Sequence, residues 1–166
     1  MMKKILLAIL VALPMLAVAQ SPKFGVVNTQ TVMEAMPDVK TVNEQIEAAS
    51  KKYEDEFQKL NEQMNKEYAD FQALDAATPE SIKQRRQQEI QDLYNKLEQF
   101  RVTASQDLQR QQQQLMAPVI EKMTTAINAV GKENGLTFIF EYGQPIYTGD
   151  DVIDVTPLVK KNLGLQ

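Results

Sequence analysis

Two long segments of the chain, 38–78 and 80–117, carry apolar residues at helical spacing and contain neither glycine nor proline. In the first segment the apolar positions are Val42, Ile46, Ala49, Tyr53, Phe57, Leu60, Met64, Tyr68 and Phe71. Their period is eleven residues, about 3.67 per helical turn, which predicts a nearly straight or slightly right-handed supercoil. The second segment follows the pattern less completely, at Leu93, Leu97, Phe100, Ala104, Leu108 and Gln111.

Pro79 lies between the two segments and predicts a turn there rather than one continuous helix. Thr78 is placed to cap the second helix, with Pro79 as its first residue. Each helix carries one narrow apolar stripe, which is enough to bury against one partner helix. The sequence therefore predicts an antiparallel hairpin over 38–117, with arms of roughly 55–60 Å. We interpret the aromatic residues of the stripes as packing between the arms, with contact to a partner molecule as the alternative.

The residues on either side of the hairpin, 20–37 and 118–166, predict a small β-rich body. Phe24–Val27 and Thr137–Tyr142 are strand-like, and a turn at Gly143 and Gln144 leads into a further extended stretch, Pro145–Thr148. Pro118 is expected to kink the second long helix, which then continues to Asn134 and Gly135.

A last helix is expected near the end of the chain, with Thr156 as its cap, Pro157 as its first residue and Gly164 at its end. The expected fold is therefore α+β and predominantly α: a long antiparallel helical hairpin, or coiled-coil tentacle, on a small β body.

Three or four short strands in so small a body leave unpaired edges and a thin core. Assembly with further copies of the chain would cover both, and the sequence contains no cysteine that could form a disulfide instead. The expected oligomer interface is formed by apolar residues of the strand-like stretches: Phe24, Val26, Phe138, Phe140 and Tyr147.

The first nineteen residues resemble an export signal. Lys3 and Lys4 precede an apolar run, and Ala17-Val18-Ala19 is the small-x-small pattern that signal peptidase recognises. Cleavage after Ala19 is expected; an uncleaved membrane anchor is the alternative, but the run is short for a span of about 20 residues. Removing the two lysines leaves 16 basic against 22 acidic residues, a net charge of −6.

The composition excludes several kinds of chemistry. The chain has no His and no Cys, so it has no Ser-His-Asp relay, no thiolate nucleophile and no zinc-finger spacing. Asp150, Asp151 and Asp154 lack the regular alternation of a calcium loop and are interpreted as turn residues. No enzyme activity, cofactor or metal is expected, and an exported acidic chain is not expected to bind nucleic acid.

A basic cluster just beyond the Pro79 turn consists of Lys83, Arg85 and Arg86. The simplest interpretation is a solvated helix face at the tip of the hairpin. Weak contact with anionic lipid at a membrane surface, or with an acidic partner, is the alternative.

Several stretches in this order resemble the OmpH/Skp family of periplasmic chaperones. They are Phe24–Gln30, Met36-Pro37, Pro118–Met123, Ala126–Gly135, Phe138–Phe140, Tyr147 and Asp154–Val159. The resemblance extends over essentially the whole chain beyond the signal peptide. It implies a homotrimer whose bodies join in one β-barrel, with three hairpins around a central cavity. It also implies ATP-independent holding of unfolded outer-membrane proteins in the periplasm.

The chain departs from the best-known members of that family in charge, since they are strongly basic. Lipopolysaccharide binding and electrostatic capture of clients are therefore not carried over. The alternative to a holdase is a structural or adaptor coiled-coil protein of the cell envelope. A second apolar stripe along the arms would favour the adaptor, and the sequence has only one stripe per arm.

Overall fold

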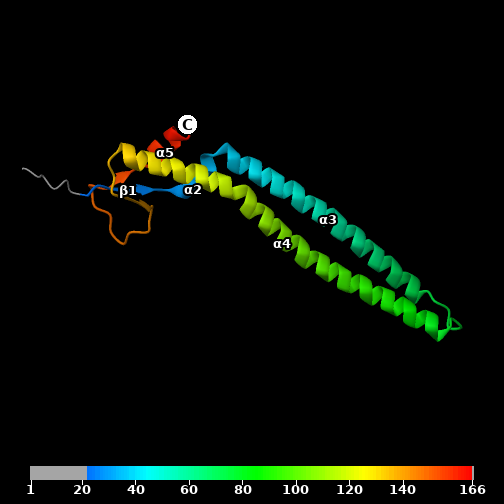
Figure 1. Cartoon of the computed structure of the whole chain (residues 1–166). Helices are drawn as coiled ribbons and strands as arrows, with labels where there is room; N and C mark the ends of the chain where they lie inside the picture. The colour runs from blue at the N-terminus through cyan, green and yellow to red at the C-terminus, as the bar shows by residue number, and fades with distance from the viewer. Residues whose placement is uncertain (1–21, 166) are drawn as a thin grey trace, which may run out of the picture.

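A computed structural model describes residues 22–165, in which two long helices form an antiparallel hairpin on a small body (Figure 1). The outgoing helix is α3 (Pro37–Gln72) and the returning helix is α4 (Glu80–Glu133). The predicted hairpin is confirmed. The expected signal peptide, with its cleavage after Ala19, lies outside the described residues. Among the described helices, none combines the length and the apolar character needed to cross a membrane.

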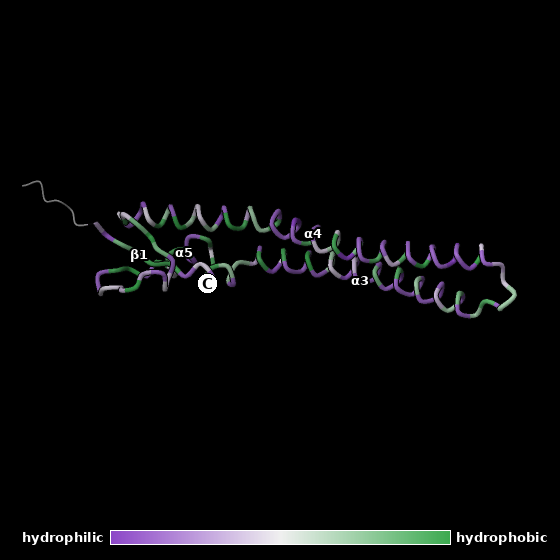
Figure 2. The backbone as a smooth tube through the Cα atoms, turned by 90° about the horizontal axis from the view of Figure 1, so that it is seen from below, coloured by the Kyte–Doolittle hydropathy of each residue, from purple (hydrophilic) through white to green (hydrophobic). Residues whose placement is uncertain are grey.

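The arms pack through the predicted apolar stripes, which we call the arm seam. Along both arms, hydrophobic and hydrophilic residues alternate in step with the helical turns (Figure 2). All six predicted positions of α4 are buried or half-buried, as are eight of the nine on α3. The exception is Tyr68, which is 53% exposed. Glu67 is half-buried in its place, because near the tip an ion pair replaces the apolar contact.

The turn at the tip differs from the predicted one. The helix α4 begins at Glu80, and Pro79 rather than Thr78 occupies the capping position. The Thr78 amide donates to the carbonyl oxygen of Asp75, and the Ala77 amide donates to Oδ1 of the same residue at 2.8 Å. Thr78 was wrongly predicted as the cap because Asp75 organises a separate turn before the proline.

Pro118 lies inside α4, which continues through it to Glu133. Proline removes one backbone donor, and its ring crowds the carbonyl of the preceding turn, so the helix axis bends there. Figure 1 shows α4 changing direction in its yellow-green stretch, between the arm and the body. The helix ends as predicted: Gly135 follows Asn134 with φ +62°.

The body is built on a three-stranded, all-parallel sheet of order β2-β1-β3. Its strands are β1 (Phe24–Val27), β2 (Phe138–Glu141) and β3 (Ile153–Asp154). The prediction of an extended strand at Pro145–Thr148 is wrong, because that stretch is irregular and β3 follows later in the chain. In the described residues the sheet of the single chain is open, and the expected barrel, which would join the bodies of three chains, stays a prediction.

One face of the sheet is covered by helices. The short helices α2 (Thr29–Ala35) and α5 (Thr156–Asn162) pack with the body end of α4 around a valine-rich core. Its most deeply buried side chains are Val32, Val130, Val155 and Val159. Val42, near the start of α3, belongs to the same cluster, so the base of the arm is anchored in the body.

Thr156 does not cap α5 as predicted, although the helix lies where it was expected and ends before Gly164 at φ +72°. The Thr156 hydroxyl instead accepts a hydrogen bond from the Asn28 amide at 2.9 Å. Asp154 Oδ1 accepts one from the Thr156 amide, also at 2.9 Å. The hydroxyl therefore links the end of β1 to the last helix, a partner that local sequence does not reveal.

The packing of α4 predicts different costs for two valines on this helix. Val119 is buried in the body core, whereas Val102 on the arm is 55% exposed. Val119→Ala should lower the free energy of unfolding by about 2–3 kcal/mol, since buried methyl groups are lost and a cavity remains. Val102→Ala brings the same gain in helix propensity but removes no buried group, so the free energy of unfolding should be unchanged or slightly higher. Urea unfolding at one protein concentration measures both; equal effects would contradict the assignment of the core.

Candidate functional site

The face of the sheet opposite the helices carries a cluster of three phenylalanines. In the parallel register Phe24 pairs with Phe138 and Val26 with Phe140, so these four side chains project to the same side. The rings of Phe24 and Phe138 are stacked, with centroids 6.3 Å apart and planes 8° apart. Phe140 lies 6.3 Å from Phe24 and 6.0 Å from Phe138. We call these three rings the phenylalanine cluster.

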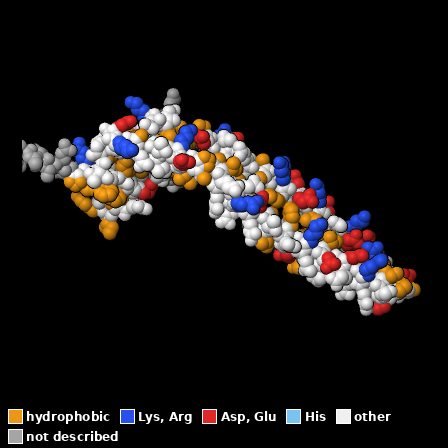
Figure 3. All heavy atoms as spheres, viewed as in Figure 1, with side chains coloured by type: hydrophobic (Ala, Val, Ile, Leu, Met, Phe, Trp, Pro, Cys, Tyr) orange, Lys and Arg blue, Asp and Glu red, His pale blue; other side chains and the backbone are white. Residues whose placement is uncertain are grey.

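Much of this cluster faces solvent in the single chain. Phe138 is 58% exposed and Phe140 is 42% exposed, whereas Val26 beside them is already buried. Tyr147 and Ile146, in the loop between β2 and β3, are almost fully exposed. Apolar side chains gather on this part of the body (Figure 3). Such an exposed apolar patch on a small body is typical of an interaction surface.

The structure thus brings together three of the five predicted interface residues, Phe24, Phe138 and Phe140. It places Val26 on the same face and Tyr147 in the neighbouring loop. Ile146 was not predicted. The sequence shows only an apolar residue between Pro145 and Tyr147. Because an extended stretch was expected there, the exposure of this side chain was not predicted. The role of all these residues in assembly stays a prediction.

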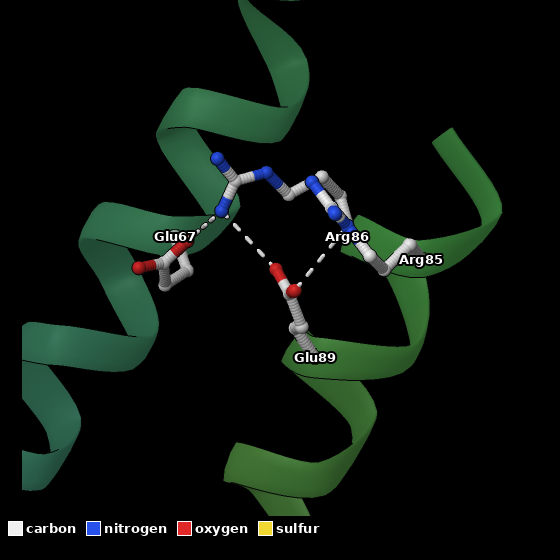
Figure 4. Close-up of polar contacts among 4 residues, drawn as sticks. All are labelled: Glu67, Arg85, Arg86 and Glu89. Carbon is white, nitrogen blue, oxygen red and sulfur yellow. Dashed lines mark hydrogen bonds and ion pairs between the residues drawn. The ribbon is translucent and has the colours of Figure 1, made fainter. Parts of the chain in front are cut away.

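The predicted basic cluster lies at the arm tip, where its charges meet acceptors of the hairpin itself (Figure 4). Arg86 Nη1 lies 3.2 Å from Glu67 Oε2 on the other arm and 3.1 Å from Glu89 Oε2. Arg85 Nε lies 3.6 Å from Glu89 Oε1. Lys83 Nζ donates to the carbonyl oxygen of Ala76 at 3.3 Å. Arg86 therefore joins the two arms, and contact of this cluster with lipid stays a prediction.

A second polar contact crosses the arm seam about halfway along the hairpin. The Tyr53 hydroxyl on α3 donates to Asp107 on α4, which also accepts from Gln111 and pairs with Arg110. The hydrogen bond from Tyr53 is the main cause that lowers the pKa of Asp107 below its usual value. The same bond raises the pKa of Tyr53. At this level of the hairpin the position of the α4 stripe is occupied by the polar residue Gln111. An open depression of about 600 Å³ lies beside Tyr53 and Phe100.

At the base of the arms a further ion pair joins the two helices. Lys122 Nζ donates to Asp38 Oδ2 at 2.9 Å, and this bond lowers the pKa of Asp38. Three polar contacts between the arms, near the base, middle and tip, thus accompany the arm seam. In residues 22–165 no group of acidic side chains is arranged to hold a metal ion.

A long helical hairpin on a small body with an exposed aromatic face is typical of a protein that works by binding other macromolecules. The family model described as outer membrane protein (OmpH-like) matches residues 23–163, and the chain belongs to this family. OmpH-like proteins are periplasmic chaperones of outer-membrane proteins, a family that is not enzymatic. No curated protein matches the chain.

The contact between Tyr53 and Asp107 predicts a pH-dependent contribution to arm stability. Because the pKa of Asp107 is lowered in the folded chain, its contribution is present above the usual value of 3.8 and is lost as the pH falls through the lowered value. Tyr53→Phe should therefore lower the thermal midpoint more at pH 7 than at pH 2.

The matched control is Tyr94→Phe, because Tyr94 is 52% exposed on α4. Its effect should be small and equal at the two pH values. Circular dichroism melts at both pH values, with protein concentration held constant, measure the four shifts. A Tyr53→Phe effect of the same size at pH 2 and pH 7 would exclude a contribution from the charged carboxylate.

Proposed function

We propose that this chain is a periplasmic, ATP-independent holdase that binds unfolded outer-membrane proteins and prevents their aggregation. Membership of the OmpH-like family carries the proposal. The hairpin supports it, because α3 and α4 project away from the body (Figure 1) and most of their residues are exposed. Removal of residues 1–19 on export belongs to the same proposal.

A holdase must keep the apolar segments and strand edges of its client away from other unfolded chains. Two slender arms joined by one seam offer a large solvent-exposed surface for this purpose. Many weak contacts spread over such a surface bind tightly in sum, while each contact releases readily. No nucleotide is needed to reset such contacts.

We also propose that three chains assemble through their bodies, with the phenylalanine cluster inside the assembly. Two observations support this. The outer strands β2 and β3 leave a backbone edge on each side of the sheet, and the cluster leaves aromatic surface in water. Strands from neighbouring chains would pair with the edges and close a barrel around the rings.

The holdase is tested by diluting a urea-unfolded outer-membrane β-barrel protein into buffer with and without residues 20–166. Light scattering should stay low with the chaperone and be unaffected by ATP. Deleting Glu62–Gln72 together with Glu80–Ile90 removes one eleven-residue repeat, about 16 Å, from each arm. The register of the arm seam is then retained, and protection should fall while the oligomeric state persists. Unchanged protection by the shortened protein would favour the adaptor alternative.

The assembly is tested by sedimentation equilibrium of residues 20–166, for which a trimer is expected at micromolar concentration. Phe138→Ala should weaken association by about 3–5 kcal/mol if the ring becomes fully buried between chains. Tyr68→Ala removes another exposed aromatic ring, from the arm, and should leave the mass unchanged. A monomeric wild-type protein, or equal effects of the two variants, would contradict the proposed interface.

A further inference from the structure

One exposed face of α4 is almost free of charge along the arm. It consists of positions three or four residues apart between Gln87 and Ile120, and we call it the glutamine stripe. It includes Gln91, Tyr94, Val102, Gln109, Gln112 and Ile120, all of them exposed. Within α4, which is described throughout, Glu98 is the one charged residue of this stripe.

The adjoining face of the same helix has the opposite character. Among its positions are five charged residues with both signs present: Arg85, Asp92, Lys96, Arg110 and Glu121. The lower edge of the hairpin, over the middle of α4, is largely white (Figure 3).

The glutamine stripe does not suit a helical partner. A packed helix needs an apolar residue at nearly every turn of the contact, as the arm seam shows. The stripe offers exposed apolar groups only at Tyr94, Val102 and Ile120. It lacks the excess of basic residues that would attract an anionic membrane or a nucleic acid.

We propose that the glutamine stripe is the surface on which α4 binds extended segments of an unfolded client polypeptide. This inference rests on the proposed holdase function and assigns its contact surface. Covering an uncharged face avoids the cost of removing ions from water. Each glutamine amide both donates and accepts hydrogen bonds, so it can replace the water that the N–H and C=O groups of a client backbone lose on contact.

The spacing of the apolar residues agrees with an extended client. Tyr94 and Val102 are eight residues apart on the helix, a rise of about 12 Å, which an extended chain covers in about four residues. This number is even, so two side chains from the same side of an extended segment can meet Tyr94 and Val102. Segments destined for a membrane barrel alternate apolar and polar residues with this period.

The first test places a photoreactive benzoylphenylalanine at Gln109 or at Arg110, which are adjacent and both exposed. A urea-unfolded outer-membrane β-barrel protein is the probe. Cross-linking from position 109 should exceed that from position 110 by about fivefold or more, since neighbouring residues on a helix point about 100° apart. Equal yields at the two positions would overturn the assignment.

The second test adds charge to one face or the other. The double variant Val102→Glu, Gln109→Glu should raise the apparent Kd for the same client about tenfold, because two unpaired charges would have to be buried. The control, Thr103→Glu with Gln114→Glu, adds the same charge to exposed positions of the adjoining face and should change the Kd less than about twofold.

Circular dichroism and sedimentation of both double variants check that helix content and mass are retained. If the wild-type protein binds the client but the two double variants weaken binding equally, the stripe is not the contact surface, although the holdase function stands. If the wild-type protein does not bind the client, the proposed function fails together with the inference.

Discussion

The narrow apolar contact between α3 and α4 is the interaction on which this structure depends. One stripe on each helix is buried, so the hairpin has one internal contact surface and everything else faces outward. An arm of this kind has no core of its own beyond the arm seam. Polar contacts between the arms, Asp38 with Lys122, Tyr53 with Asp107 and Glu67 with Arg86, help to set its register. Most residues of the two long helices are therefore exposed to solvent.

The body holds the base of both arms and so sets the direction in which they project. Val42 at the base of α3 and Val119 in α4 share one cluster with the valines of α2 and α5, so both arms are held where they leave the body. Between this cluster and the arm, Pro118 bends α4. The opposite face of the sheet keeps the phenylalanine cluster in water. The same small body thus anchors the arms on one face of the sheet and exposes aromatic rings on the other.

The hairpin could be predicted from the sequence because its signal is local and repeated. The eleven-residue spacing, the absence of glycine and the position of Pro79 all indicate the same structure. The body was less predictable, because its partners lie more than one hundred residues apart: Asn28 with Thr156, and Phe24 with Phe138. Local patterns placed Thr78 and Thr156 as helix caps, but Thr78 belongs to a separate turn formed by Asp75, and the Thr156 hydroxyl accepts from the distant Asn28 amide. The glutamine stripe was visible only as a run of polar residues until α4 showed which of them share a face.

The central position of β1 has a consequence for biogenesis. This strand is near the amino terminus, and both of its neighbours lie near the carboxyl terminus. A chain that is synthesised amino terminus first has therefore exposed β1 long before β2 and β3 arrive. The contacts between the arms are closer in sequence than those of the sheet and form during this interval, since local contacts form faster than distant ones. The sheet is completed only when nearly the whole chain is available, so a truncated product would have arms but no sheet.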